Sequence, residues 1–242
     1  MALIEVRNLW KSFGENHVLS GVNLSVEKGS TVVILGKSGV GKSVLLKIII
    51  GLITPESGSV QIDGQEVCGM RHKGLNALRR TMGYLFQGAA LYDSMSVREN
   101  LAFPLERHER LSREEVEERV VNQLRLVGLE SALDRMPSEL SGGMKKRIGL
   151  ARALITNPRI MLYDEPTTGL DPITSREISY LMQSMKERYQ PTSIAVTHDM
   201  VCARIVADKA TILHDGMLEQ QGTIESLERS QDEIVRGFFA SE

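Results

Sequence analysis

The sequence predicts an α/β fold in which a parallel sheet is combined with an antiparallel β portion and an inserted helical subdomain. Residues 30–35 read as a buried strand, with four consecutive apolar residues at 32–35, and a glycine-rich stretch and an apolar helix follow it. Two further apolar runs, residues 160–163 and 193–196, are separated by a helix-length segment, which is the alternation of a parallel sheet. Residues 88–156 show no convincing strand pattern, which indicates the helical insert.

The antiparallel portion is predicted from alternation and from turn residues. Residues 3–7 and 22–26 alternate apolar and polar side chains, as half-buried strands do. The dipeptides Asp63-Gly64 and Asp215-Gly216 each separate two strand-like segments, and such dipeptides favour tight hairpin turns.

Helices are predicted in the insert. Ser112 begins a capping box and is followed by an apolar series at Val116, Val120 and Leu124, and a second helix is expected from about residue 143 to 155. A chain of 242 residues fits one large domain. We predict that residues 1–242 form it, with the β subdomain and the sheet core in 1–87 and 157–242 and the helical subdomain in about 88–156.

Composition excludes several classes. Hydrophobic residues make up 42% of the chain, which is sufficient for a core, and the formal net charge of −2 argues against nucleic acid as a partner. Cys68 and Cys202 have no metal-type spacing, so we expect small buried hydrophobes and a reducing compartment. The N-terminus has charges where a signal peptide is apolar, and no apolar run approaches the ~20 residues of a membrane span. Membrane association is therefore expected only through a partner.

Residues 36–43 read G-x-x-x-x-G-K-S between the predicted strand and helix, which is a phosphate-binding loop in its required context. The glycines let backbone N–H groups approach phosphate oxygens, and the helix directs its positive end at the same anion. Lys42 is expected to reach the outer phosphates and Ser43 to ligate Mg²⁺. The fold is therefore expected to be a P-loop NTPase with a RecA-like parallel-sheet core that binds a nucleoside triphosphate.

The strand at residues 160–163 ends in two carboxylates, Asp164 and Glu165. In a phosphate-loop protein, Asp164 suits Mg²⁺, and Glu165 is placed to accept a proton from water attacking the γ-phosphate. Alone, the pattern also fits a strand that ends at solvated acids.

Ser141 followed by Gly142 and Gly143 is the second informative motif. Ser141 is a natural helix N-cap, and the glycines leave backbone N–H groups free to approach an anion. A capped helix start would explain these residues equally well, were the motif not located between the phosphate loop and the Asp-Glu strand.

Taken in order, these motifs resemble those of the nucleotide-binding subunit of an ATP-binding-cassette (ABC) transporter. Residues 36–43 match Walker A, Gln87 the Q-loop, residues 140–144 the signature, and residues 160–165 Walker B. The remaining matches are Phe13 as the aromatic residue that stacks on adenine, residues 169–171 as the D-loop, and His198 as the switch histidine.

The resemblance implies an ATPase in which two copies face each other head to tail. ATP would lie between Walker A of one copy and the signature of the other, with Asp171 communicating across the interface. His198 would contact the γ-phosphate, and Gln87 would sense the metal and the attacking water. Taken singly, His198, Gln87 and Phe13 fit structural roles better than catalytic ones; only their register with the other motifs assigns them here.

The predicted site follows from these matches. Its catalytic residues are Glu165, His198, Gln87 and Lys42, and its metal residues are Ser43, Gln87 and Asp164. The residues expected to contact ATP are Phe13, Gly36, Lys37, Ser38, Gly39, Val40, Gly41, Lys42, Ser43, Val44, Ser141, Gly142, Gly143 and Asp171. Three residues depart from the family pattern without removing a phosphate or metal ligand. Many members have Gln in place of Met144, Tyr is frequent in place of Phe13, and Tyr163 puts a hydroxyl group in an otherwise aliphatic strand.

Within the family, residues 39–47, 88–97, 100–105 and 164–175 resemble ATPases of Mce/Mla-type lipid transport systems, as does Met144. That resemblance implies integral permease subunits, an Mce-domain lipid-binding protein, phospholipid or another hydrophobic lipid as cargo, and a location on the cytoplasmic face of the inner membrane. Residues 88–95 either pack beneath the helical insert or contact the permease, and a charge at Leu91 is expected to uncouple transport in the second case.

Other classes remain as alternatives. An importer for amino acids or metals shares the ATPase motifs, because the substrate is chosen by other subunits. An ABC ATPase acting on DNA or ribosomes would need long coiled coils or two cassettes in one chain, and a phosphate-loop kinase or GTPase has no use for residues 140–144. Phe238 and Phe239 near the C-terminus fit either a docked terminal helix or a partner contact.

Overall fold

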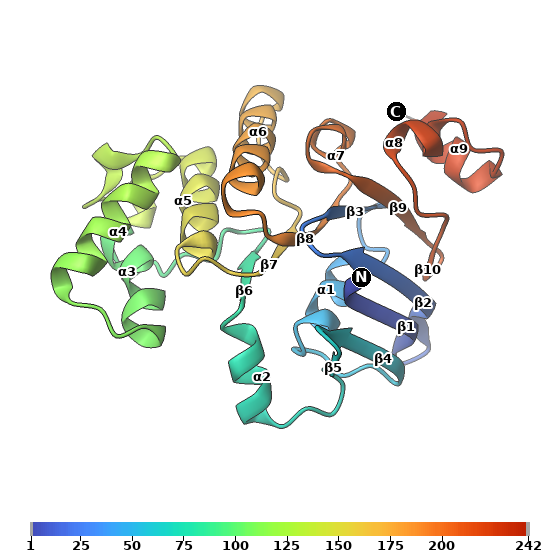
Figure 1. Ribbon diagram of the computed structural model, residues 1–242. Coiled ribbons are helices and arrows are strands. Elements are labelled where there is room, and N and C mark those ends of the chain that lie inside the picture. The colour runs from blue at the N-terminus through green and yellow to red at the C-terminus, as the bar shows by residue number, and fades with distance from the viewer. Residues whose placement is uncertain (1, 241–242) are drawn as a thin grey trace.

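The computed structural model describes residues 2–240, and a six-stranded sheet forms its centre (Figure 1). The strand order is β10-β9-β3-β8-β7-β6; all neighbours are parallel except β10, which pairs antiparallel with β9. Its strands are β3 (Thr31–Leu35), β6 (Met82–Leu85), β7 (Ile160–Asp164), β8 (Thr192–Thr197), β9 (Lys209–His214) and β10 (Met217–Leu218). Every residue of β3, β7 and β8 is buried, which is why these strands read as continuous apolar runs rather than alternating ones.

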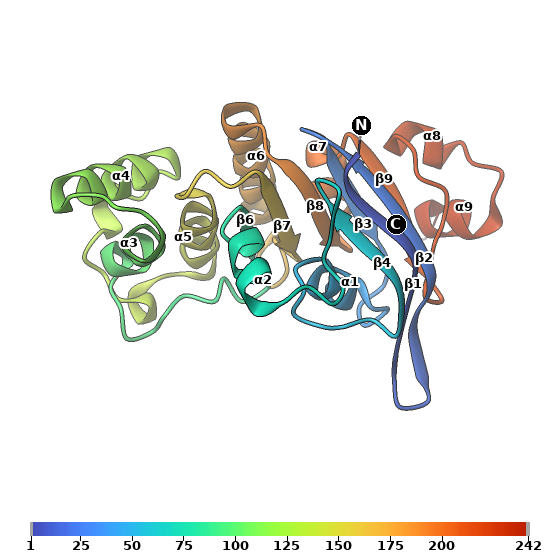
Figure 2. The same cartoon turned by 60° about the horizontal axis from the view of Figure 1, so that its bottom comes forward.

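A second, antiparallel sheet has the order β2-β1-β4-β5. Its strands are β1 (Ala2–Phe13), β2 (Asn16–Glu27), β4 (Ser57–Ile62) and β5 (Gln65–Glu66). The hairpin of β1 and β2 extends beyond the body of the protein (Figure 2). Both predicted turns are present: Asp63 and Gly64 have φ of 51° and 74°, and Asp215 and Gly216 have 44° and 78°.

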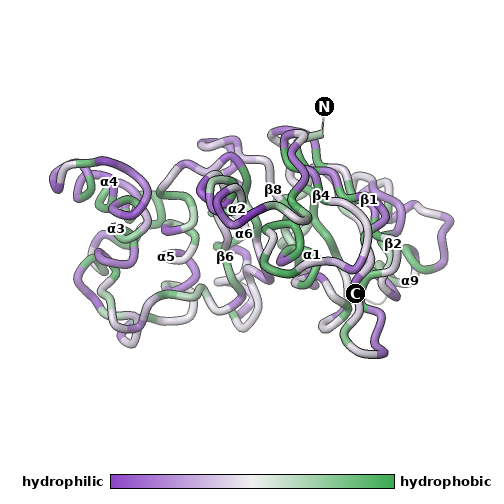
Figure 3. Tube along the Cα trace, turned by 90° about the horizontal axis from the view of Figure 1, so that it is seen from below, coloured by the Kyte–Doolittle hydropathy of each residue, from purple (hydrophilic) through white to green (hydrophobic). Residues whose placement is uncertain are grey.

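Nine α-helices and two short 3₁₀ helices lie among the described residues. They are α1 (Lys42–Ile49), α2 (His72–Arg79), α3 (Val97–His108), α4 (Arg113–Leu126), η1 (Glu130–Ala132), η2 (Pro137–Glu139), α5 (Gly142–Leu154), α6 (Pro172–Tyr189), α7 (Met200–Val206), α8 (Ile224–Glu228) and α9 (Glu233–Ala240). Helix α1 lies between the two sheets and shares one apolar core with both (Figure 1). Figure 3 shows hydrophobic residues running along α1, whereas α4 is largely hydrophilic.

The opposite face of the central sheet is covered by α6 and α7, with α5, α8 and α9 contributing to a second core. Helix α9 buries Val235 completely and packs Phe238 and Phe239 partly against this core. The two phenylalanines are therefore explained by a docked terminal helix.

Helices α3, α4 and α5 enclose a third core of their own (Figure 1). The predicted capping box at Ser112 is confirmed at the start of α4. The helix predicted from about 143 to 155 is confirmed as α5, which begins and ends one residue earlier, at Gly142 and Leu154. Helix α3 was not predicted, although Ser96 and Glu99 form a capping box there as well. Within the described chain, residues 88–156 contain no strand, and the subdomain limits at 88 and 156 stay a prediction.

Cys202 is fully buried, as predicted, but Cys68 is half-buried against the first core. Across residues 2–240, we find no helix with both the length and the apolar character needed to cross a membrane.

Gly83 provides a test of how closely the helical subdomain packs on the sheet. A Cβ atom at this position of β6 would overlap the carbonyl of Ala153 in α5 and the sulfur of Met161 in β7. Overpacking of this kind costs about 1–3 kcal/mol, so Gly83→Ala should lower the urea midpoint of unfolding. Gly237→Ala is the matched control, because the same methyl group would meet nothing within 4 Å. Equal midpoints for Gly83→Ala and the parent would contradict this packing.

Candidate active site

The phosphate loop connects β3 to α1, and its last glycine shapes the turn. Gly41 is the N-cap of α1 with φ of 107°, a left-handed conformation that glycine adopts without strain, and a Cβ there would lie 2.6 Å from Val18. Helix α1 has neither a side-chain cap nor an acidic residue in its first turn. Its free N–H groups and positive end are therefore available to an anion.

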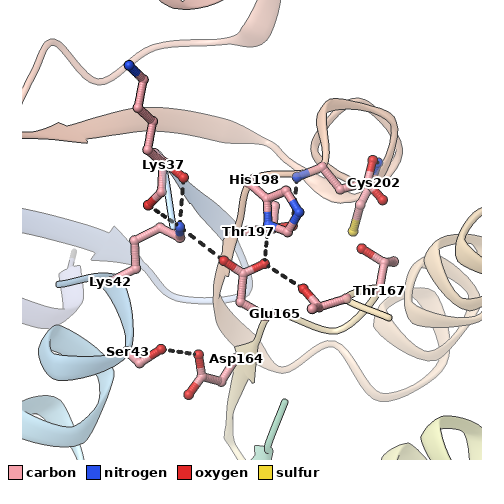
Figure 4. Close-up of polar contacts among 12 residues, drawn as sticks. Lys37, Lys42, Ser43, Asp164, Glu165, Thr167, Thr197, His198 and Cys202 are labelled. Atoms are coloured by element: carbon pink, nitrogen blue, oxygen red, sulfur yellow. Dashed lines mark hydrogen bonds and ion pairs between the residues drawn. The ribbon is translucent and has the colours of Figure 1, made fainter. Parts of the chain in front are cut away.

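Lys42 is almost completely buried, and each of its three N–H donors has an oxygen partner. Its Nζ donates to the carbonyls of Gly36 at 2.7 Å and Lys37 at 3.0 Å, and it forms an ion pair with Glu165 Oε1 at 3.0 Å. Figure 4 shows the ammonium group between the loop and the carboxylate. A buried charge of this kind requires such partners, because burial of an unpaired ammonium group is costly.

Glu165 lies at the centre of a polar cluster. Its backbone has φ of 49°, a strained left-handed conformation for a residue that is not glycine. Besides the ion pair of Oε1 with Lys42, its Oε2 is 2.8 Å from His198 Nδ1 (Figure 4). Oε2 also accepts a hydrogen bond from the Thr168 hydroxyl at 3.1 Å. The carboxylate is thus held by three neighbours while the His198 side chain is half-exposed.

Asp164 and Ser43 form a second polar pair beside the ion pair of Lys42 and Glu165 (Figure 4). The Ser43 hydroxyl donates to Asp164 Oδ1 at 2.6 Å, so the two residues expected to hold Mg²⁺ are in contact. Tyr84 of β6 donates its hydroxyl proton to Asp164 Oδ2 at 3.0 Å. Burial, and then the charge of Asp164, raise the pKa of Tyr84, which keeps the phenol a neutral donor.

Lys146 brings a second buried ammonium group to the site from α5. Its Nζ donates to the Glu165 backbone carbonyl at 3.0 Å. Burial lowers the pKa of Lys146 to about 8, against the opposing effect of Glu165 and Asp164. Lys146 was not predicted, although the sequence held a signal for it: Lys146, Leu150 and Leu154 share one helical face, and all three are buried.

A cavity of about 270 Å³ opens over this cluster. It is lined by Phe13, Val18, Ser38, Gly39, Gly41, Lys42, Ser43, Val44, Gln87, Glu165, Thr168 and His198. The structure therefore brings most of the residues predicted from Walker A, Walker B, the Q-loop and the switch histidine to one cavity. Gly36, Lys37 and Val40 belong to the loop but do not form the wall, and Val18 and Thr168 were not predicted.

The signature and D-loop residues do not line this cavity. Ser141 caps α5 by accepting a hydrogen bond from Met144 N, and Asp171 caps α6 through Ile173 N and Thr174 N. Hydrogen bonds from Thr174 lower the pKa of Asp171. The two helix starts lie against each other, since a Cβ on Gly143 would be 2.7 Å from Thr174 Cγ2. Ser141, Gly142, Gly143 and Asp171 thus form a surface separate from the cavity of their own chain.

Comparisons with known proteins agree with this geometry. The sequence profile of ABC transporters matches residues 19–168. The intermembrane phospholipid transport ATP-binding protein MlaF of Haemophilus influenzae is 41% identical over 99% of this chain and 91% of its own length. The probable ribonucleotide transport ATP-binding protein mkl of Mycobacterium leprae is 42% identical over 98% of this chain and 68% of its own.

Among solved structures, a dimeric ATP-binding cassette in a post-hydrolysis state, bound to ADP and phosphate, is similar to this chain, with a TM-score of 0.83. The two sequences are 34% identical, and the match covers 91% of this chain and 98% of the cassette. Its likeness and that of the sequences confirm the P-loop NTPase fold with its antiparallel and helical parts. The chain belongs to the ABC transporter family and is an ATP-binding ATPase whose hydrolysis of ATP is coupled to transport.

Proposed function

We propose that this chain energises a membrane transporter that moves phospholipid or another hydrophobic lipid between membranes. The observation that carries the cargo is the similarity to MlaF, which extends over nearly the full length of both chains. Sequence identity by itself does not select the cargo, because mkl, named for ribonucleotide transport, is as similar. The residues 88–97 and 164–175 that resemble Mce/Mla-type ATPases add support for a lipid.

The nucleotide would occupy the 270 Å³ cavity. The N–H groups of the loop and of the start of α1, together with Lys42, would hold its phosphates. Phe13 lines the cavity at the end of β1 and is 51% exposed. The Lys11 ammonium group lies over its ring, 5.1 Å from the centroid, which leaves the other face of the ring to stack on adenine. His198 and Gln87, both in the cavity wall, would contact the γ-phosphate and the attacking water.

The ion pair between Lys42 and Glu165 gives these residues a sequence of action. Phosphate oxygens would compete with Glu165 for the Lys42 ammonium group, since both are anionic. Binding of ATP would then release Glu165 Oε1 to accept a proton from water, while His198 and Thr168 keep holding Oε2. Glu165 would therefore act as a general base only when the nucleotide is present.

The donor set beside this cluster fits Mg²⁺. Ser43 and Asp164 offer hard oxygen ligands in contact with each other. The described residues include no group of three or more His, Cys, Asp or Glu side chains placed to hold a metal, and Mg²⁺ bound by one carboxylate, a hydroxyl and substrate phosphates needs none. When bound, Mg²⁺ neutralises charge on the phosphates. Gln87 would lie close to it from the cavity wall.

A second copy of the chain would complete the site. Ser141 and the two glycines lie on a surface away from their own cavity, so they can meet a nucleotide only in a partner copy. The dimeric form of the similar cassette supports this arrangement. ATP held between two copies would stabilise the closed dimer, and hydrolysis would release it.

Integral permease subunits, with an Mce-domain lipid-binding protein, would hold the chain at the cytoplasmic face of the inner membrane. Leu91 packs partly against the core of the helical subdomain, so a charge there would also disturb folding. A cavity of about 390 Å³ is better suited to a test, because its lining includes Arg79, Arg80, Arg107, His108 and Arg152 and no carboxylate. Arg152 connects it to residues 88–95 by donating to the carbonyls of Ala89 and Ala90. We propose that an acidic segment of the permease docks there.

Arg107→Glu is expected to weaken co-purification with the permease by about tenfold or more, since charge reversal at a complementary surface replaces attraction by repulsion. Binding of ATP should not change, because Arg107 does not line the nucleotide cavity. Arg110→Glu is the matched control: it has the same charge change on an exposed residue that does not line the 390 Å³ cavity. Equal permease recovery with both variants would contradict docking at this cavity.

The cargo is tested by a tagged pull-down from detergent-solubilised membranes of the native host, with mass spectrometry of proteins and lipids. A small permease with an Mce-domain protein and phospholipid would support the proposal. A permease with a solute-binding protein would instead identify the alternative, an importer for amino acids or metals. Recovery of neither a permease nor phospholipid would contradict the proposal.

A further inference from the structure

The carboxylate of Asp164 is held at both oxygens by hydroxyl groups. Ser43 donates to Oδ1 at 2.6 Å, and Tyr84 donates to Oδ2 at 3.0 Å. Asp164 is only 5% exposed, so water has little access as a substitute donor. Ser43 and Asp164 are the proposed Mg²⁺ ligands, whereas the proposed function assigns no role to Tyr84.

Strand register explains how Tyr84 reaches this carboxylate. Tyr84 of β6 pairs with Leu162 of β7, and Asp164 is two residues beyond Leu162. Since side chains two apart point to the same face of a strand, Tyr84, Leu162 and Asp164 share one face. A tyrosine side chain is long enough to reach such a diagonal neighbour.

The ring of Tyr84 is fixed independently of its hydroxyl. It contacts the ring of Phe86, with 4.2 Å between the ring centroids, and it packs against the core around α1. The hydroxyl donates to Asp164 Oδ2 at 3.0 Å, and a carboxylate oxygen can only accept that hydrogen bond. Packing thus places the hydroxyl, and the hydroxyl places one oxygen of Asp164.

We propose that Tyr84 is a positioning residue for the divalent cation: by holding Asp164 Oδ2, it leaves Oδ1 directed with the Ser43 hydroxyl toward the metal. This inference rests on the Mg²⁺ site of the proposed function. A carboxylate anchored at one oxygen presents the other in a single orientation. Loss of an outer partner of a metal ligand typically costs about 10–100-fold in metal affinity.

The test is Tyr84→Phe, which removes the hydroxyl and keeps the ring against Phe86. Affinity for Mn²⁺, used as a paramagnetic substitute for Mg²⁺, is measured by electron paramagnetic resonance in the presence of a non-hydrolysable ATP analogue. We expect Mn²⁺ affinity to fall by about tenfold. Analogue affinity in EDTA should be unchanged, and raised Mg²⁺ should restore ATPase activity.

Tyr189→Phe is the matched control. Its hydroxyl donates to Gln123 Oε1 at 2.9 Å, so it loses a similar hydrogen bond away from the nucleotide cavity. Unchanged or tighter Mn²⁺ binding by Tyr84→Phe would overturn the inference, and so would a loss of analogue affinity in EDTA, which indicates a merely structural role. If the parent protein itself bound no Mn²⁺ with the analogue, the proposed metal site would fail first, and this inference with it.

Discussion

Replacement of Glu165 by glutamine is expected to slow ATP hydrolysis by roughly 10²- to 10⁴-fold, the usual contribution of a general base. An amide cannot take the proton of the attacking water, although it keeps the size and the hydrogen-bonding reach of the carboxylate. The same change removes the anionic partner of Lys42. Because phosphate oxygens then need not displace a carboxylate from the Lys42 ammonium group, ATP binding should be kept or strengthened.

The measurement is phosphate release at saturating ATP, together with the affinity for a fluorescent ATP analogue. Glu118→Gln makes the same substitution at an exposed position of α4 and should hydrolyse ATP at the parent rate. A Glu165→Gln variant that also hydrolysed ATP at the parent rate would show that another group is the base. Loss of ATP binding would show that Glu165 supports the fold of the loop instead.

Substitution of Ser141 by arginine should abolish hydrolysis without weakening ATP binding to the isolated chain. Ser141 is exposed and lies outside the cavity of its own chain, so the contacts of that chain with ATP stay intact. In the head-to-tail dimer, the larger charged side chain would occupy the position of the partner's γ-phosphate. A phosphate-loop kinase or GTPase would be unaffected, because it makes no use of this residue.

This substitution also removes the N-cap of α5, at a cost of about 1 kcal/mol. Ser112→Arg removes the cap of α4 in the same way and therefore controls for stability. The pair is compared by ATPase rate and by analogue affinity. Full activity of Ser141→Arg would contradict the role of the signature, and loss of analogue binding by Ser141→Arg alone would place Ser141 in its own chain's site.

Local pattern was sufficient for the parts of this protein that depend on neighbours in sequence. The phosphate loop was predicted because its glycines and the flanking strand and helix are contiguous. The hairpins at Asp63 and Asp215 depend on two turn residues each. By contrast, β1 and β2 extend well beyond the predicted residues 3–7 and 22–26. Their full length was not predicted, because register shifts between Val6 and Leu9 and between Leu9 and Trp10 interrupt the alternation of apolar and polar residues.

Helices α2 and α3 show a different limit. Helix α2 is only eight residues long and has no fully buried residue; Leu75 and Leu78, which pack partly against the first core, are a single turn of apolar repeat, too short to predict a helix from sequence. Helix α3 contains Pro104, which weakens its helical pattern, although the capping box at Ser96 could have indicated its start.

The contacts of the site that were missed are tertiary. Lys42 and Glu165 were each predicted, but their ion pair depends on how β3 and β7 align across β8. Tyr84 reaches the Asp164 carboxylate through strand register, and Lys146 reaches the Glu165 backbone carbonyl through helix packing. Residue type and spacing do not specify such contacts, because they are set by which elements the fold places side by side.

An ATP site shared between two copies is tested most directly by the mass of Glu165→Gln in solution, measured by light scattering with and without ATP and Mg²⁺. We expect a single chain of 26.9 kDa without nucleotide and twice that mass with ATP. Addition of Ser141→Arg to the same chain should abolish the doubling. A mass that stays at one chain under saturating ATP, or a doubling that persists with Ser141→Arg, would contradict an ATP site shared between two copies.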